Sequence, residues 1–251
     1  MKIEIQQTSP KLNKSNLVDV LEIVKNSKAD LVLFPELALN GYKIKDALFE
    51  DAFSLDELDE LKLLSQTKDI CIGVALKEEH KIYNASIYFQ NGEAIIYKKQ
   101  HLPTYGVFEE ARFFFAGDES FCFDSKFGKT AMFICEDMFS GDVLNYIASE
   151  KPDLVLVLAN SPAREFKNDS FLIQDNWYSI IKTSSILSGS YTLFANRVGF
   201  EDGLGFWGGS CVITPKGEIE KQAKLFEVDK IETKMNKKLS TTQKYYLRKN
   251  K

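Results

Sequence analysis

The fold is decided by Lys129-Thr130-Ala131-Met132-Phe133-Ile134-Cys135-Glu136-Asp137, a mostly apolar stretch that ends on a thiol. Two other stretches have the same form. Asp30-Leu31-Val32-Leu33-Phe34-Pro35-Glu36 ends on a carboxylate, and Ile95-Ile96-Tyr97-Lys98-Lys99-Gln100-His101-Leu102-Pro103 delivers an amine. An apolar run of roughly four to eight residues is typical of a strand covered on both faces, and open α/β sheets collect their chemistry at the carboxyl ends of such strands. We therefore expect Glu36 and Cys135 on one rim of a layered fold, where Lys99 can join them.

Strand-like and helix-like segments alternate along the rest of the chain. Apolar residues recur at helical spacing in 16–25, and Ser54 with Glu57 has the form of a capping box before a second helix. Asn91-Gly92 is a strong hairpin signal between two strands. Further strands are predicted at 70–76, 83–89, 94–99, 153–158, 191–195 and 210–214, and further helices at 143–149 and 171–188. The pattern predicts an α/β fold with a mixed sheet or two sheets.

Composition restricts the function classes. The chain has 251 residues and a net charge of −4, so it lacks the basic footprint of a nucleic-acid-binding protein. No apolar stretch approaches the length that crosses a bilayer, and the first residues alternate like a strand rather than a signal peptide. A cytoplasmic protein with neither nucleic-acid nor membrane partners is the expectation.

The cysteines and histidines argue against a zinc site or a disulfide framework. Four cysteines are scattered without a C-x-x-C pair, and there are only two histidines. We interpret three of the cysteines as small buried apolar residues, namely Cys71, Cys122 and Cys211. Cys135 remains as the candidate nucleophile.

A thiol at Cys135 needs a proton acceptor and a positive neighbour. Only the thiolate attacks, and Glu136 and Asp137 alone would raise the thiol pKa by repulsion between like charges. Lys99 is the natural cation, and Glu36 can take the thiol proton and pass it to a leaving amine. The backbone N–H after Cys135 and the Lys99 ammonium can hold an oxyanion.

The spacing leaves a second pairing open. In an extended segment His101 lies on the same face as Lys99, so a protease-like dyad of Cys135 and His101 satisfies the same pattern.

The three motifs together resemble the nitrilase superfamily, the carbon–nitrogen hydrolases. The matching residues are Leu33-Phe34-Pro35-Glu36-Leu37, Lys99-Gln100-His101-Leu102-Pro103 and Ile134-Cys135-Glu136-Asp137, in the family's order and spacing. The resemblance implies a four-layer α-β-β-α sandwich and an active homodimer or larger assembly. It also implies Glu36 as general base, Lys99 as stabiliser of the tetrahedral intermediate and Cys135 as nucleophile, with no metal or organic cofactor.

The same resemblance assigns two further residues near the triad. A second glutamate often assists in this family, and the spacing to Gly117 selects Glu110 rather than Glu109. His101 then becomes a structural residue beside Lys99 rather than the base.

Two longer segments are similar to the glutaminase domain of glutamine-dependent NAD synthetases. These segments are 34–42, with the later Asp46, and 102–110. In that domain the residues matching Tyr42, Tyr105 and Ser161 line the glutamine pocket, so the resemblance makes these three the candidate substrate-binding residues. Phe139 stands where the family usually has Trp, and no Ser-Gly-Gly pyrophosphate loop is present, so we expect no adenylating activity.

The sequence therefore predicts an amidase that releases ammonia or an amine from a small-molecule carboxamide. The alternatives are a glutaminase subunit that feeds a separate ammonia-accepting synthetase, a nitrilase, and a non-catalytic scaffold. Arg164 or the tyrosines are candidates for holding a substrate carboxylate. The glycine-rich stretch 203–209 lacks the spacing of a phosphate loop and is interpreted as turns.

The expected domain boundaries are 1–228 for the hydrolase domain and 229–251 for a C-terminal segment. This segment holds eight basic residues and two acids. It is either a solvated tail or an arm that docks on a neighbouring subunit through Tyr245, Tyr246 and Leu247.

Overall fold

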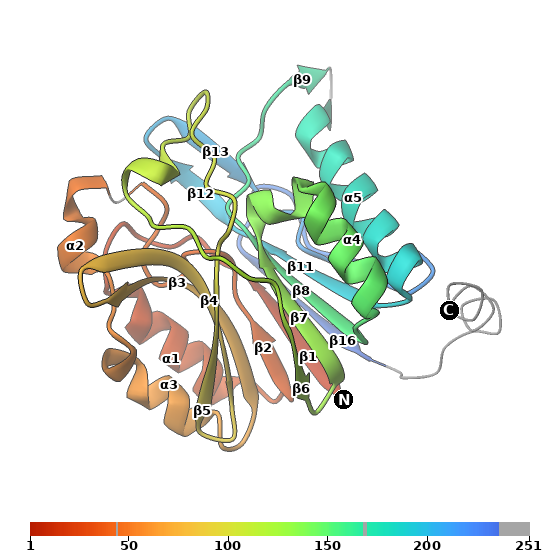
Figure 1. Cartoon of the computed structure of the whole chain (residues 1–251), viewed down its shortest axis with the longest axis horizontal. Coiled ribbons are helices and arrows are strands. Elements are labelled where there is room, and N and C mark those ends of the chain that lie inside the picture. Colours follow the sequence, from red (N-terminus) through yellow and green to blue (C-terminus); the bar gives the residue numbers. More distant parts are fainter. Residues whose placement is uncertain (44, 168–169, 236–251) are drawn as a thin grey trace.

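The computed structural model describes residues 1–43, 45–167 and 170–235, and within them two six-stranded sheets lie face to face (Figure 1). The first sheet has the order β16 (Asp229–Lys234), β1 (Lys2–Gln7), β2 (Leu31–Leu33), β3 (Asp69–Glu78), β4 (Lys81–Gln90), β5 (Glu93–Lys98). The second has the order β15 (Ile219–Gln222), β14 (Cys211–Ile213), β11 (Tyr191–Asn196), β8 (Leu154–Ala159), β7 (Gly128–Ile134), β6 (Cys122–Ser125).

Helices cover the outer face of each sheet. On the first sheet these are α1 (Asn16–Asn26) and α3 (Asp59–Leu64), and on the second α4 (Gly141–Glu150) and α5 (Leu172–Ser188) (Figure 1). A short helix, α2 (Leu48–Asp51), flanks the first sheet. The predicted four-layer α-β-β-α sandwich is confirmed.

Two apolar layers explain why the central strands are apolar without alternation. In β2, Leu31 and Leu33 belong to the core that includes residues of the second sheet, whereas Val32 belongs to the core shared with α1 and α3. Successive side chains of a strand point to opposite faces, so a strand between two covered faces must be apolar at every position.

The strand directions bring the three reactive stretches to one edge. β1, β2 and β3 are parallel, and β5 runs in the same direction because two antiparallel pairings separate it from β3. In the second sheet β7, β8 and β11 are parallel. Glu36 follows β2, Lys99 follows β5 and Cys135 follows β7, so each lies at the carboxyl end of its strand.

Most predicted elements are present, with boundaries displaced by a few residues. The helix predicted at 16–25 is Asn16–Asn26, and the long helix predicted at 171–188 is Leu172–Ser188. The hairpin at Asn91-Gly92 joins β4 and β5, and the capping box of Ser54 and Glu57 is formed. No helix within the described ranges is long and apolar enough to cross a membrane.

Two segments differ from the sequence-based prediction. Residues 229–234, assigned above to the C-terminal segment, form β16 and pair antiparallel with β1 along its whole length, so the sheet continues beyond the expected boundary at 228. Ile231 and Thr233 are buried between exposed neighbours. In the sequence, the lysines of this edge strand make that alternation hard to recognise. The rest of the proposed tail, 236–251, lies outside the described residues.

The glycine-rich stretch contains a strand as well as turns. Leu204–Trp207 forms β13, which pairs with β12 (Val198–Glu201) in a two-stranded hairpin. A second short hairpin contains β9 (Phe166–Lys167) and β10 (Ser170–Phe171).

Candidate active site

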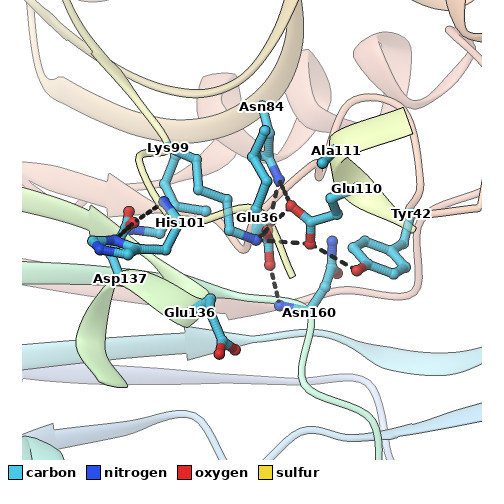
Figure 2. Close-up of polar contacts among 12 residues, drawn as sticks. Glu36, Tyr42, Asn84, Lys99, His101, Glu110, Ala111, Glu136, Asp137 and Asn160 are labelled. Carbon is cyan, nitrogen blue, oxygen red and sulfur yellow. Dashed lines mark hydrogen bonds and ion pairs between the residues drawn. The ribbon is translucent and has the colours of Figure 1, made fainter. Parts of the chain in front are cut away.

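A buried ammonium held by two carboxylates is the centre of the candidate site (Figure 2). Lys99 Nζ lies 2.8 Å from Glu36 Oε1, and it lies 2.8 and 2.7 Å from the two carboxylate oxygens of Glu110. Lys99 and Glu36 are fully buried, and Glu110 is 4% exposed. Glu109, the acid that the family spacing rejected, is partly exposed and pairs with Arg112 instead.

The cluster sets the pKa values of its members. Burial alone would lower the pKa of Lys99, but the Glu110 and Glu36 carboxylates outweigh burial and raise it well above its usual value. Burial raises the pKa of Glu110 from 4.5 to about 7, opposed by Lys99 and reinforced by Glu36. At neutral pH Lys99 is therefore a fixed cation, while Glu110 is close to its titration midpoint.

Three groups complete the hydrogen bonding of the two carboxylates, and of these the sequence analysis assigned only Tyr42, as a substrate-binding residue. Asn84 Nδ2 donates to Glu36 Oε1 at 2.7 Å and approaches Glu110 Oε2 at 3.4 Å. The backbone N–H of Asn160 donates to Glu36 Oε2 at 2.6 Å, and Tyr42 Oη donates to Glu110 Oε1 at 2.7 Å (Figure 2). Every carboxylate oxygen in the cluster thus has a donor, which fixes both side chains.

The sequence contains a signal that could have pointed to Asn84. It is a polar residue in the middle of a buried strand, and its partners lie 48 and 26 residues away in the chain. A lone buried amide in such a strand indicates a polar network, although the sequence does not say which one.

The turn that carries Glu36 depends on a glycine in the neighbouring strand. A Cβ on Gly73 would lie 2.4 Å from the Leu37 nitrogen and 2.5 Å from both Glu36 Cα and the Pro35 oxygen. Gly73 N also donates to Pro35 O at 3.1 Å. The absence of a side chain at Gly73 therefore allows the turn to pack directly onto β3, which positions Glu36.

Cys135 occupies a sharp turn at the end of β7. Its φ is +47°, an uncommon conformation for a residue other than glycine, and residues Cys135–Phe139 form a 3-10 turn. The thiol is partly buried and lines a cavity together with Glu110, Asn160, Ser161 and Arg164. Strained backbone of this kind is common where a side chain must be presented to a ligand.

The electrostatic surroundings of Cys135 disfavour its thiolate. Burial raises the pKa of this thiol well above its usual value, Glu36 raises it further, and Lys99 opposes the shift. The predicted cation is thus present and acts in the expected direction, but it does not outweigh burial and the carboxylates.

His101 is bound on another side of the site, with Asp137. Its Nδ1 lies 2.9 Å from Asp137 Oδ1 (Figure 2). Asp137 Oδ1 also accepts from the backbone N–H groups of His101 and Gln100, while Tyr97 Oη donates to Asp137 Oδ2 at 2.8 Å. Within the described ranges no hydrogen bond joins His101 to Cys135. The geometry favours a structural His101 over the dyad.

The three candidate substrate-binding residues lie in different surroundings. Ser161 is buried in the Cys135 cavity, where its Oγ accepts from Trp177 Nε1 at 2.9 Å. Tyr42 is bound to Glu110 and faces a neighbouring hollow with Leu48 and Phe114. Tyr105 is 51% exposed and donates to Glu136 Oε1 at 2.9 Å, so it lies at the rim.

Sequence comparison places this chain in a class of proteins. The profile of the carbon–nitrogen hydrolase family matches residues 4–244. The chain therefore belongs to the carbon–nitrogen hydrolases, a family of enzymes that hydrolyse carbon–nitrogen bonds.

Individual relatives make the comparison more specific. The glutamine-dependent NAD(+) synthetase of Acinetobacter baylyi is 30% identical over 235 residues, which cover 90% of this chain and 42% of that protein. A probable nitrilase of Schizosaccharomyces pombe is 30% identical over 206 residues, covering 78% of this chain and 71% of that protein. The solved structure of glutamine-dependent NAD+ synthetase from Acinetobacter baumannii superposes with a TM-score of 0.78 at 27% identity, over 92% of this chain and 44% of that one.

Proposed function

We propose that this protein is an amidase that cleaves a small-molecule carboxamide through a thioester on Cys135. The observation that carries the proposal is the buried Glu36–Lys99–Glu110 cluster, whose charges act on the Cys135 thiol. Membership of the carbon–nitrogen hydrolase family supports the type of bond that is cleaved.

In the first half-reaction Cys135 Sγ attacks the carboxamide carbon. The raised thiol pKa means that the proton leaves during attack rather than before it, and Glu36 accepts the proton as general base. The S–C bond forms and the carbonyl oxygen becomes an oxyanion. The C–N bond then breaks, and Glu36 returns the proton to the leaving nitrogen, so ammonia or an amine departs and a thioester remains.

In the second half-reaction water replaces the amine. Glu36 takes a proton from the water as it attacks the thioester carbon, the C–S bond breaks, and the thiol recovers its proton. A carboxylic acid is released. The steps need neither a metal nor an organic cofactor, because Glu36 moves the protons and Lys99 stabilises the negative charge.

Lys99 is suited to stabilise the oxyanion because its charge is fixed and its position is constrained. Its ammonium is buried and bound to two carboxylates, so it needs no reorganisation when charge develops nearby. Glu110 binds the ammonium directly, and Tyr42 donates a hydrogen bond to Glu110.

The substrate is proposed to carry a carboxylate. Arg164 lines the Cys135 cavity, with its guanidinium 4.8 Å from the centre of the Phe108 ring, and its Nε is buried without a hydrogen-bond partner among the described residues. An arginine in this state is a suitable receptor for an anionic group. Ser161 in the same cavity is a second candidate contact.

A second candidate function is a glutaminase that supplies ammonia to a separate synthetase. The observation that favours it is the match to glutamine-dependent NAD synthetases over about nine tenths of this chain. Under this proposal glutamine is the substrate, and a synthetase that accepts ammonia is the partner.

The test is ammonia release from glutamine, asparagine, small aliphatic amides, ω-amidated dicarboxylates and N-carbamoyl compounds. We expect release from at least one amide, and we expect Cys135→Ala to abolish it. Release from glutamine that needs an added synthetase would support the glutaminase, and release from another amide alone would support an independent amidase.

Two results would contradict the proposal. Turnover that survives in Cys135→Ala would remove the thioester mechanism. Turnover of a nitrile but of no amide would make the protein a nitrilase. The non-catalytic scaffold would gain support if electrophilic substrate analogues formed no adduct on Cys135.

A further inference from the structure

Asn160 is a buried asparagine whose side chain has no hydrogen-bond partner. Its side chain is almost completely buried, with 1% of its surface exposed, and neither Oδ1 nor Nδ2 is bonded within the part of the chain that the structure describes. It lines the same cavity as Cys135. Buried polar side chains are normally hydrogen-bonded, so one with both polar atoms unpaired calls for an explanation.

Two other buried asparagines of this protein show the ordinary arrangement. Asn196 Oδ1 accepts from Ser161 N at 2.9 Å while its Nδ2 donates to Gly208 O at 2.9 Å. Asn40 Oδ1 accepts from Ala75 N at 2.8 Å while its Nδ2 donates to Asp51 O at 2.5 Å. Both atoms of each side chain are satisfied. Asn84 is intermediate, because its Oδ1 has no partner among the described residues while its Nδ2 donates to Glu36. Among the buried asparagines that the structure describes, Asn160 alone has both side-chain atoms unpaired.

The backbone of Asn160 fixes where its side chain lies relative to the proton acceptor. The Asn160 N–H donates to Glu36 Oε2 at 2.6 Å, and Asn160 follows β8, the strand beside β7 that carries Cys135. The side chain is thus anchored next to Glu36, the proposed general base, and it lines the cavity that contains the Cys135 thiol.

We propose that Asn160 is a specificity-determining residue that binds the reacting carboxamide, an inference that rests on the proposed amidase function. A primary amide presents one acceptor and one donor side by side, and the group that pairs with both is another carboxamide. Nδ2 donates to the substrate carbonyl oxygen, and Oδ1 accepts an N–H of the nitrogen that will leave. A carboxylic ester has no such N–H, so Asn160 favours amides over esters of the same acid.

The experiment compares each amide with the matched ester, in the unsubstituted protein and in one variant. The kcat/KM is measured for glutamine and glutamate γ-methyl ester, and for succinamic acid and monomethyl succinate, with the unsubstituted protein and with Asn160→Ala. We expect the variant to lose about 10- to 100-fold on the amides, because two hydrogen bonds are removed, and several-fold at most on the esters.

Thermal unfolding separates this role from a structural one. Asn160→Ala removes no hydrogen bond made by the side chain within the described ranges, so its Tm should stay within about 2 °C of the unsubstituted protein or rise. Asn196→Ala is the matched control, and its Tm should fall because two bonded atoms lose their partners.

The outcomes distinguish the inference from the function on which it rests. An equal loss on amide and ester in Asn160→Ala, or a Tm that falls as far as in Asn196→Ala, would overturn the inference and leave the amidase standing. If the unsubstituted protein hydrolysed none of the four compounds, the proposed function would fail for them, and the role of Asn160 would fall with it.

Discussion

The two walls of the candidate site differ in how their polar groups are satisfied. On one wall, the saturated wall, the charged groups of Lys99, Glu36 and Glu110 bind one another. Asn84 Nδ2 and the Asn160 backbone supply further donors to the carboxylates, and Asn84 Oδ1 is left unpaired in the part of the chain that the structure describes. On the other wall, the unpaired wall, the side chains of Asn160 and Arg164 have buried polar atoms without hydrogen-bond partners among the described residues, and both line the cavity that contains Cys135.

The difference separates two requirements of catalysis. Groups that move protons or stabilise charge must be fixed before the substrate arrives, because reorganisation during the reaction costs free energy. Groups that recognise the substrate must keep their hydrogen-bonding capacity free until it binds, which lowers the stability of the free protein. The saturated wall is expected to contribute to folding and to turnover, and the unpaired wall to substrate choice.

Lys99→Ala tests the saturated wall most severely. Removing one member of a buried ion pair leaves uncompensated charges, here Glu36 and Glu110, so we expect a loss of about 3–5 kcal/mol in the free energy of unfolding. Turnover of the amide should fall about 10³-fold or more. Urea unfolding and ammonia release measure the two effects.

The adjacent lysine provides the control. Lys98 pairs with Glu78 in a partly exposed salt bridge, so Lys98→Ala should cost about 1 kcal/mol or less and leave most turnover intact. Similar losses of stability in the two variants would contradict the view that the buried cluster is a stabilising unit.

Glu36→Gln should lower turnover while making the free thiol more reactive. The variant keeps the shape of the side chain but removes the general base, so amide hydrolysis should fall about 10²- to 10⁴-fold. Glu36 also raises the pKa of Cys135, second only to burial, so its loss should lower that pKa. Iodoacetamide should then alkylate Cys135 faster at a given pH near neutrality.

Slower amide hydrolysis together with faster alkylation would distinguish a Glu36 that accepts the thiol proton from one that only positions the thiol. If alkylation slowed together with turnover, Glu36 would act by holding the thiol in place rather than by accepting its proton. Mass spectrometry of the alkylated peptide that contains Cys135 keeps the other three cysteines out of the measurement.

The sequence predicted the saturated wall better than the unpaired one. Glu36, Lys99 and Cys135 each end an apolar run, so strand recognition and parallel packing were enough to expect them at one edge. The choice of Glu110 over Glu109 came from family spacing, and the structure places Glu110 against Lys99 and Glu109 at the surface.

What the sequence could not provide depends on contacts between distant segments. Asn84 and Asn160 approach Glu36 from 48 and 124 residues away, and no local pattern marks these pairings. Likewise β16 pairs with β1, which lies near the opposite end of the sequence. The exposed face of β16 is rich in lysine, which suits an edge strand but in the sequence resembles a solvated tail.

The last variant, Glu110→Gln, tests an effect on stability that depends on pH. The folded protein holds the Glu110 proton up to a pKa of about 7, mainly because of burial, whereas the unfolded chain releases it near 4.5. Folding therefore binds a proton within this window, and stability should decline as pH rises from 4.5 to about 7 and then level off. The decline should be about 3.5 kcal/mol, since the two pKa values differ by about 2.5 units and one unit corresponds to about 1.4 kcal/mol.

Urea unfolding at a series of pH values tests this linkage, with Glu109→Gln as the matched control. Glu110→Gln should lose the decline, because the amide does not titrate. Glu109→Gln should keep it, because that carboxyl is partly exposed and pairs with Arg112 outside the buried cluster. A decline that persisted in Glu110→Gln would mean that another member of the saturated wall takes up the proton. The pKa of about 7 would then belong to the cluster as a coupled unit rather than to Glu110 alone.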